Sequence, residues 1–466
     1  MIVTEDTDMS MGRRKGEDQG QMFIAISDLP STAGHPFYEK LNEALRALGF
    51  DAKVEAACQK FYHESVGRRG IAPGVYFRML LIGYFEGIDS ERGIAWRVAD
   101  SLSLRRFLGY PLGDETPDHS SLSRIRGRLD PDTHALVFQM ILQALQAAGL
   151  VKGQTIGVDA TTLEANAALR SIVRRDTGQS YQEYLEGLAK AAGIANPTRA
   201  DLAKIDRKRK GKGSNMEWEH PHDPDARIAK MKDGRTHLAH KAEHVVDLET
   251  GALLGVSLHG ADQGDTQTVV PSLEAAFGHL AQALEATGQA LPAGLFAELV
   301  TDKGYHANES LVALQEDLGM RTYVSEPDRG RRKWEDQPAA QKAVYANRRR
   351  VKGERGKRLL RMRGERLERS NAHMYETGGM RRTHLREHEN ILKRLIVHAA
   401  GFNLGLLMRA WIGIGKPRCL QDLKKALLAF FTLLWTVLST VAGQWWFRRA
   451  HPVVRRPHYR SDSLAA

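Results

Sequence analysis

The stretch TIGVDATTLEANAA, residues 155–168, marks the change from helical periodicity to strand-like sequence. Its first four residues form a β-type run that leads directly into Asp159, and a helix-like segment, LEANAALRSIV, follows. One interpretation is that a strand ends here and that the aspartate caps the next element. The other is chemical, because a carboxylate held rigidly on a buried strand can bind a metal ion.

The composition indicates a soluble globular protein with a polyanionic partner. The 466 residues suffice for two or three domains, and the shares of hydrophobic (42%) and charged (26%) residues are ordinary for a soluble globular protein. Sixty-seven Lys and Arg against 56 Asp and Glu give a formal net charge of +11, which favours a polyanionic partner. Only two cysteines occur, Cys58 and Cys419, so we expect a reducing interior rather than a disulfide framework.

The first part of the chain is predicted to be helical. Residues 1–30 are polar and lack the apolar core of a secretory signal, so we expect a disordered leader. Residues 31–150 carry repeated helical periodicity, punctuated by Gly and Pro, with few strand-like runs. This pattern predicts an all-helical N-terminal domain.

The second part is predicted to be α/β over residues 151–412, with a basic insert near 165–235. HKAEHVVDL (240–248) and ALLGVSLHG (252–260) flank a turn at Glu249-Thr250-Gly251 and indicate a hairpin. A helical segment at 271–288 then alternates with strand-like runs at 295–305 and 322–327. Strands that open antiparallel and then alternate with helices predict a mixed sheet covered by helices.

The helical tail at residues 413–466 has a basic end and contains ALLAFFTLLWTVLSTVAG, residues 426–443. This run is about the shortest that can cross a bilayer. The alternative is a helix covered by protein, which we favour because hydroxyl residues dilute the run: Thr432, Thr436, Ser439 and Thr440. We therefore expect a cytoplasmic, nucleoid-associated protein.

A second acid stands in LVTDKGYHA, where Asp302 follows an apolar strand-like run. Two acids, each at the exit of a strand, form a more specific pattern than either acid alone. A Mg²⁺ site requires one or two such carboxylates together with substrate phosphate oxygens. Asp159 and Asp302 are thus the candidate metal ligands.

Two basic segments are candidate DNA contacts. The stretch at 346–385 is rich in arginine around two acids, Glu365 and Glu368. In TPDHSSLSRIRGRL, residues 116–129, Asp118 or Ser120 can cap a basic helix suited to a DNA groove. A solvated face with ion pairs is the alternative in both cases. The residues expected to contact DNA are Arg124, Arg126, Arg348, Arg349, Arg350, Lys352 and Arg361.

Three blocks together resemble the DDE transposases of bacterial insertion sequences: GVDATTLEANAA, TDKGYH and ERSNAHMYETGGMRRTHLREHENILKRLIVHAAGFNLGLLMR. The helical region ending in PDHSSLSRIRGRL is similar to the N-terminal domain found in part of that group. The resemblance covers roughly residues 30–410, and its blocks occur in the family's order.

The resemblance implies a ribonuclease-H-like core with a triad of Asp159, Asp302 and Glu368. It implies Mg²⁺ (or Mn²⁺) held by these acids, cleavage by water, and strand transfer by the freed 3′-hydroxyl without a covalent protein–DNA intermediate. Many relatives carry a lysine seven positions after the glutamate. Tyr375 stands there in this chain, so that DNA contact is not carried over.

Helix geometry separates Glu368 from Glu365 independently of the family. At about 100° per residue, an apolar stripe should face the sheet: Leu360, Leu367 and Met374. Glu368 lies at the margin of this stripe, in line with Gly364 and Asn371. Glu365 lies near the opposite face, where a surface ion pair is the expected role.

The other polar clusters in the sequence are interpreted as loops or as residues outside the catalytic site. His220, His222, Asp223 and Asp225 resemble metal ligands, but the neighbouring prolines favour a loop. KIDRKRKGKG, residues 204–213, is predicted to be a flexible basic loop that touches DNA phosphates. His306 and His373 lie near the candidate acids in the sequence, but we do not assign either of them a role in orienting DNA.

The sequence therefore predicts a transposase that acts on the terminal repeats of its own element and on target DNA. We expect a homodimer or larger assembly on double-stranded DNA and no small-molecule substrate. The alternatives are a metal-dependent nuclease with the same core that cuts without joining, and an inactive DNA-binding derivative.

Overall fold

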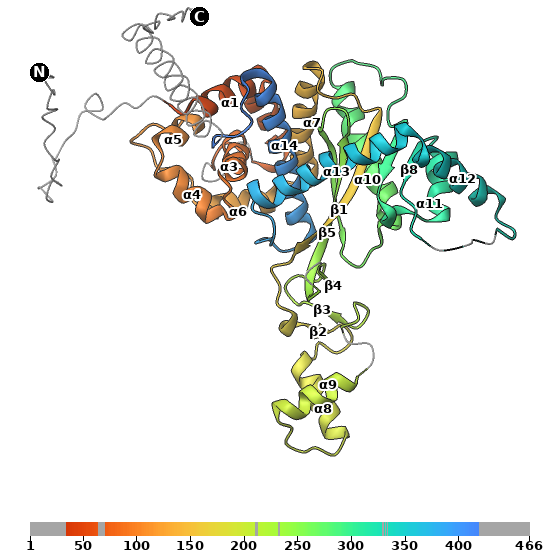
Figure 1. Cartoon of the computed structure of the whole chain (residues 1–466). Coiled ribbons are helices and arrows are strands. Elements are labelled where there is room, and N and C mark those ends of the chain that lie inside the picture. The colour runs from red at the N-terminus through yellow and green to blue at the C-terminus, as the bar shows by residue number, and fades with distance from the viewer. Residues whose placement is uncertain are drawn as a thin grey trace, which may run out of the picture.

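The computed structural model describes residues 34–63, 70–209, 213–231, 234–328, 330, 332 and 334–418. The predicted leader and the 426–443 segment lie outside these residues. The architecture is α/β, with helices at the N-terminal side, a mixed sheet and a long helix near the end of the described chain (Figure 1). This confirms the predicted fold class.

The N-terminal region consists of short capped helices. Ser90, Ser101, Asp118 and Asp130 each accept a hydrogen bond from the backbone N–H three residues ahead, which satisfies an otherwise unpaired donor at the start of a helix. The helices are α1 (Pro36–Ala47), α2 (Phe50–Cys58), α3 (Pro73–Glu86), α4 (Glu91–Ala99), α5 (Leu102–Leu108), α6 (His119–Arg128) and α7 (Pro131–Ala147).

The central sheet runs in the order β6-β5-β1-β7-β8, and β4 continues the outer edge of β5. β1 pairs antiparallel with β5, and β5 pairs antiparallel with β6, whereas β7 and β8 run parallel to β1. The strands are β1 (Thr155–Glu164), β4 (Arg227–Lys230), β5 (Thr236–Asp247), β6 (Leu253–Gly260), β7 (Glu298–Thr301) and β8 (Arg321–Val324). The sheet is therefore mixed, as predicted.

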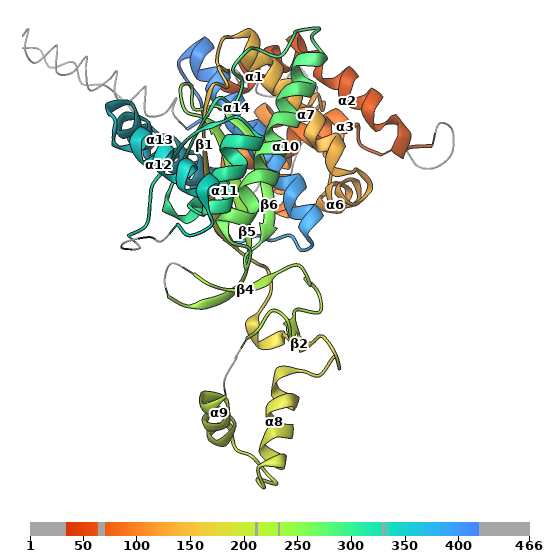
Figure 2. The same cartoon turned by 90° about the vertical axis from the view of Figure 1, so that its right-hand side faces the viewer.

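Helices cover both faces of the sheet (Figure 2). Consecutive residues of β5 show this, because side chains alternate between the faces of a strand. The Glu243 carboxylate accepts hydrogen bonds from α10 (Asp265–Glu285), while His244 Nδ1 lies 3.1 Å from Ser370 Oγ on α13 (Glu354–Ala372). Two further helices, α11 (Asn308–Val312) and α12 (Pro338–Lys352), pack together, and α12 packs beside β8.

α14 (His388–Ile412) joins the N-terminal helices to the sheet, since it packs against α3, α7 and β6. By length and composition it is the one helix in the described residues that is apolar enough to cross a membrane, yet 72% of its apolar window is buried inside the protein. Its apolar side chains belong to a hydrophobic cluster that includes both the N-terminal helices and the strands. Protein contacts thus account for its apolar character.

Two buried asparagines bond to the outer strands of the sheet. Asn403 of α14 donates to Leu253 O (2.8 Å) and accepts from Leu253 N (3.0 Å) on β6. Asn347 of α12 makes the same pair of bonds to Val324 on β8, at 2.8 and 2.9 Å. Each side-chain amide therefore replaces one residue of a neighbouring strand.

The region between β1 and β4 protrudes from the body of the molecule (Figures 1 and 2). It contains a two-stranded sheet, β2 (Val173–Arg174) with β3 (Trp218–Glu219), and two helices, α8 (Tyr181–Ala191) and α9 (Arg199–Lys208). The buried Trp218 ring contacts Tyr181 and Tyr184 and forms the centre of its small core. We call residues 165–235 the insert.

Two local predictions are wrong. LEANAALRSIV does not form an α-helix, because β1 continues to Glu164 and is followed by a 3₁₀ turn at Leu169–Ser171 and by β2. Asp159 consequently lies in the middle of a strand and neither ends it nor caps a helix. The long register with β5, from Ile156↔Asp247 to Glu164↔Ala239, supplies backbone hydrogen bonds that outweigh the helical preference of the Leu, Glu and Ala residues.

Candidate functional site

The structure brings the two predicted aspartates together. β1 and β7 are neighbours and run parallel, with Gly157 opposite Val300, so Asp302, the residue after β7, lies level with Asp159 in the middle of β1. The Arg363 guanidinium of α13 contacts both: its Nη2 lies 2.7 Å from Asp159 Oδ1 and 3.7 Å from Asp302 Oδ2. Two carboxylates from different strands therefore share one cation.

α13 presents a second polar group to the site. Asn371 Nδ2 donates to Asp159 Oδ2 at 3.0 Å, two turns after Arg363. Leu367 lies between them and packs on β1 at Gly157, where a Cβ would approach Leu367 Cδ1 to 3.1 Å. The absence of a side chain at Gly157 thus lets the helix approach close enough to place Arg363 and Asn371 on Asp159.

The third predicted acid makes no contact with the aspartates. Glu368 and Glu365 are both exposed, and neither has an ion pair or hydrogen bond within the described part of the chain. The predicted stripe is confirmed for Leu367 and Met374, which are buried. Glu368 is the neighbour of Leu367 on the helix and precedes Asn371 by three residues, so it lies beside the site without entering it.

A divalent cation fits the chemistry of this donor set, although no group of three or more His, Cys, Asp and Glu residues in the described chain is arranged as a metal site. Carboxylate and amide oxygens are the ligands that Mg²⁺ prefers. Asn371 Oδ1 is buried and has no hydrogen-bond partner among the described residues. Asp159 and Asp302 already accommodate one cationic group, the Arg363 guanidinium.

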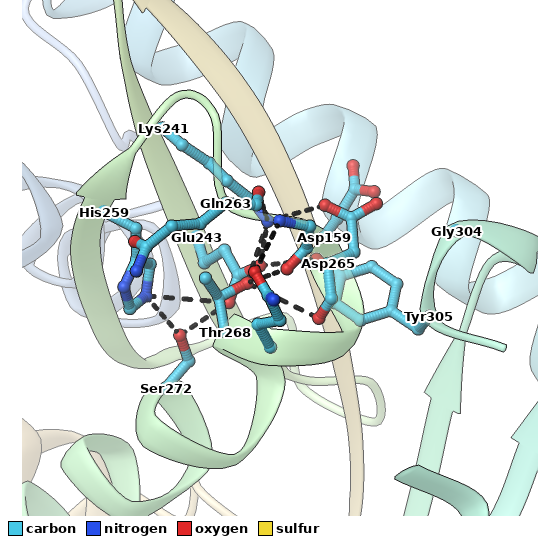
Figure 3. A network of polar contacts seen from close by, with 12 residues as sticks. Asp159, Lys241, Glu243, His259, Gln263, Asp265, Thr268, Ser272, Gly304 and Tyr305 are labelled. Atoms are coloured by element: carbon cyan, nitrogen blue, oxygen red, sulfur yellow. Dashed lines mark hydrogen bonds and ion pairs between the residues drawn. The ribbon is translucent and has the colours of Figure 1, made fainter. Parts of the chain in front are cut away.

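A buried polar network lies on the other face of the sheet, around Glu243 (Figure 3). The carboxylate is fully buried and accepts hydrogen bonds from Thr268 Oγ1 (2.5 Å), Ser272 Oγ (2.6 Å) and the Tyr305 hydroxyl (3.1 Å). Burial and the neighbouring Glu243 charge raise the pKa of Tyr305. This network was not predicted from the sequence. Its signal was the pair Lys241 and Glu243, which are two residues apart and so share one face of a buried strand.

The basic segment from Arg348 to Arg363 divides into two groups. The first holds α12 and α13 to the sheet region: Arg348 forms a bidentate pair with Glu326 (2.6 and 2.8 Å), Arg350 donates to Thr322 O (2.9 Å), and Arg355 pairs with Glu298 (2.6 Å). The second group is exposed to solvent: Arg349, Lys352, Arg358 and Arg361. Among the predicted DNA contacts, Arg348 and Arg350 are therefore already engaged within the protein.

The α6 arginines also differ from one another. Asp118 is the cap, accepting from Ser121 N at 2.7 Å, and the bond lowers the pKa of its carboxyl. Arg124 is exposed, and its guanidinium is 3.3 Å from Ser120 Oγ. Arg126 instead forms an ion pair with Glu91, and both side chains are only 16% exposed. Arg124 remains available to a partner, whereas Arg126 links α6 to α4.

Of the histidines singled out in the sequence, His220 and His306 are buried and His373 is partly buried, whereas His222 is exposed. Asp223 Oδ2 lies 3.3 Å from His240 Nε2, with both side chains fully buried, and Asp223 Oδ1 accepts from Glu387 N. These contacts tie the base of the insert to the start of α14. His306 is buried, and burial lowers the pKa of His373, which packs on Phe402, to about 4.

The basic segment at 204–213 was predicted to be a loop, but its first part is helical. α9 ends at Lys208, and Lys204, Arg207 and Lys208 are exposed on one side of it. Thr198 and Asp201 form a capping box at its start. Residues 210–212 lie outside the described chain.

Comparison with known proteins finds one match, which covers the N-terminal helices of the chain. Residues 28–128 match the family model of a transposase domain, described as "Transposase domain (DUF772)". This match supports a transposase of insertion-sequence type and, with it, DNA as the partner. No curated protein and no solved structure matched the chain.

Proposed function

We propose that the protein is a transposase that binds the terminal repeats of its insertion sequence and catalyses DNA strand cleavage and strand transfer with Asp159, Asp302 and Glu368. The observation that carries this proposal is the convergence of Asp159 and Asp302 on the Arg363 guanidinium. The family match over residues 28–128 supports the same class of protein independently, because it covers a separate part of the chain.

The reaction requires attack on a phosphodiester whose anionic oxygens repel a nucleophile. Mg²⁺ or Mn²⁺, bound by Asp159, Asp302 and Glu368, would activate the attacking oxygen and stabilise the leaving oxygen. Asn371 fixes the Asp159 carboxylate through its 3.0 Å hydrogen bond. Water is the first nucleophile, and the freed 3′-hydroxyl is the second, so we assign no serine or tyrosine nucleophile.

The exposed basic residues of α12 and α13 supply the electrostatic contact with DNA. Arg349, Lys352 and Arg361 are free of the sheet contacts that engage Arg348 and Arg350. Phosphate contacts of this kind position a duplex without reading its sequence. We place the protein on double-stranded DNA in the cytoplasm, as a homodimer or larger assembly.

The decisive experiment is a strand-transfer assay with matched element ends and Mg²⁺. Asp159→Asn and Asp302→Asn keep the side-chain shape but remove a charge, so cleavage should fall by orders of magnitude while DNA binding persists. Asp262→Asn, in an exposed loop, is the matched control. Joined products identify a transposase, cut products alone a nuclease, and binding alone an inactive derivative. Full cleavage by Asp159→Asn would exclude this residue from the site.

A further inference from the structure

The exposed half of α9, at the end of the insert, carries positive charge only. At about 100° per residue, the exposed residues of this helix all fall on one half of its circumference: Arg199, Ala200, Ala203, Lys204, Arg207 and Lys208. The partly buried residues fall on the other half: Asp201, Leu202, Ile205 and Asp206. The basic residues of the exposed half are called the α9 basic face: Arg199, Lys204, Arg207 and Lys208.

Both acids of α9 are engaged on its inner half. Asp201 Oδ2 accepts a hydrogen bond from Thr198 Oγ1 at 2.6 Å in the capping box, and Asp206 Oδ1 accepts one from the Tyr181 hydroxyl at 2.7 Å. Within the described ranges no ion pair involves a residue of the α9 basic face, whereas the neighbouring Arg209 pairs with Asp206. The charges of the face are therefore not used to hold the insert together.

Helix stability does not explain this charge pattern. Lys204 precedes Arg207 by three residues and Lys208 by four, and like charges at these spacings destabilise a helix. The helix dipole favours cations in the last turn but disfavours Arg199 at the first position. A helix that is only solvated usually alternates the sign of its exposed charges. The one-sided charge indicates an anionic partner.

The insert holds α9 in a fixed place. Trp218 forms the centre of its core, and its base is tied to the start of α14. Asp223 Oδ1 accepts a hydrogen bond from Glu387 N (3.3 Å), and Asp225 Oδ2 accepts one from His388 N (3.1 Å). Figures 1 and 2 show α9 at the far end of the insert, apart from α12 and α13. A surface that is already in position loses less conformational freedom when it binds.

The length of the face suits a nucleic-acid backbone. From Arg199 to Lys208 the helix rises about 14 Å, at about 1.5 Å per residue. Successive phosphates of one DNA strand are about 3.4 Å apart along the axis, so the face spans about four of them. The family match over residues 28–128 supports DNA, rather than another polyanion, as the partner.

We propose that the α9 basic face binds the phosphate backbone of a DNA duplex at a place separate from the contact made by α12 and α13. The inference rests on the proposed function, because it takes DNA as the partner. It gives the insert a role of its own, as an arm that holds DNA away from the candidate aspartates. Phosphate contacts carry no sequence information directly, so the arm positions a duplex and does not select it.

The first test neutralises the face and measures DNA affinity against salt. Lys204→Gln, Arg207→Gln and Lys208→Gln together should reduce the slope of log affinity against log salt by about 0.9 for each lost phosphate contact. The loss should be the same for a terminal repeat and for an unrelated duplex. The inner residues of α9 stay unchanged, so the protein should melt normally.

A control variant loses the same three charges from exposed positions on separate segments: Lys53→Gln, Lys152→Gln and Arg321→Gln. Its slope should equal that of the unmodified protein. An unchanged slope in the α9 variant, or an equal loss in the control, would overturn the inference.

A combined variant tests whether the arm is a separate contact. Adding the α9 changes to neutralisation of Arg349, Lys352 and Arg361 should lower the slope by the sum of the two separate losses, since distant sites act independently. A combined loss no larger than that of the α12 and α13 changes alone would show that the two groups do not hold separate phosphates, against the inference.

Photo-crosslinking identifies what touches the face. Ala203→p-benzoylphenylalanine places a crosslinker among the basic residues without removing any of them, and irradiation of the complex should link it to DNA. The same change at Ala286, exposed at the end of α10, is the control and should give no link to DNA. A link from position 203 to a second copy of the chain, or no link at all, would overturn the inference.

Failure of the inference is distinguishable from failure of the proposed function. If the α9 variant keeps its salt slope while Asp159→Asn abolishes cleavage, the proposed function stands and the face is only solvated. If the α9 variant loses slope while Asp159→Asn still cleaves, the DNA contact stands and the proposed catalytic site is wrong. If the unmodified protein binds no duplex, both are wrong.

Discussion

Arg363 is the residue that links the two candidate aspartates. Asp159 and Asp302 carry like charges that repel each other. The Arg363 guanidinium contacts both carboxylates and reduces this repulsion. The side chain is 18% exposed and its Nε is buried without a hydrogen-bond partner in the described chain. The hydrogen-bonding capacity of this guanidinium is therefore not fully used among the described residues.

We predict that Arg363→Gln lowers the melting temperature in EDTA and increases the stabilisation gained on adding Mn²⁺. Removing the arginine takes away the cation that the two carboxylates share and frees the oxygens that contact it for the metal. Ligand binding then stabilises the folded protein by mass action. Thermal melts with and without Mn²⁺ measure both effects. Arg355→Gln, which breaks a pair with Glu298 away from the site, should lower the melting temperature equally under both conditions.

At the scale of elements, α13 has two functional sides. Its inner side carries Arg363, Leu367 and Asn371 toward β1. Its outer side carries the exposed Arg358, Arg361 and Glu365, and the exposed Glu368 lies at the margin between the two sides. A single helix thus supports the aspartates on one side and exposes charge to solvent on the other.

We predict that Glu368→Gln abolishes strand cleavage and that Glu365→Gln leaves most of it. Glu368 adjoins Leu367 and lies in line with Asn371, which bonds to Asp159, so a rotamer change can turn it toward the aspartates. The measurement is cleavage of an element end with Mg²⁺. Loss of cleavage in Glu365→Gln alone would assign the third acid to Glu365.

The exposed basic group should govern the salt dependence of DNA binding. Neutralising Arg349, Lys352 and Arg361 together should reduce the slope of log affinity against log salt by about 0.9 for each phosphate that the protein no longer neutralises. Arg348→Gln is the matched control, because Arg348 is paired with Glu326 and should affect stability rather than the slope. An unchanged slope in the triple variant would identify these residues as a solvated face.

Some features of these elements could be predicted from the sequence, and others could not. Apolar runs ending at Asp159 and Asp302 located both aspartates. Helical spacing correctly predicted that Leu367 of α13 and Met374, in the helical turn that follows α13, are buried. The extent of β1 was mispredicted, because its pairing with β5 involves residues about 80 positions away and no local pattern reports it. The sequence also could not show which arginines are paired within the protein and which are exposed. The partners of the paired arginines, such as Glu326 and Glu298, lie far away in sequence.

At the scale of the whole molecule, α14 makes the N-terminal helices and the sheet share one hydrophobic cluster. Residues that follow the proposed active site along the chain are buried between helices that precede it. The region matched by the transposase-domain model and the proposed catalytic sheet are therefore joined by packing as well as by the chain.

We predict that Asn403→Ala lowers the free energy of unfolding by about 2–4 kcal/mol, because it leaves the buried N–H and C=O of Leu253 without partners. Hydrogen exchange should increase together in α3 and in β6, since both pack on α14. Asn390→Ala, near the exposed start of α14, is the control and should change little. Faster exchange in β6 alone would show that the two regions unfold independently.

The amide bonds of Asn347 and Asn403 have a consequence for how copies of this chain can associate. An outer strand with unpaired backbone groups invites another chain to add a strand to it. Here the backbone groups of Val324 on β8 and of Leu253 on β6 are already occupied by side chains from α12 and α14. At these positions the sheet is complete within one molecule. The two asparagines therefore oppose association of copies of this chain by strand addition at Val324 of β8 and at Leu253 of β6.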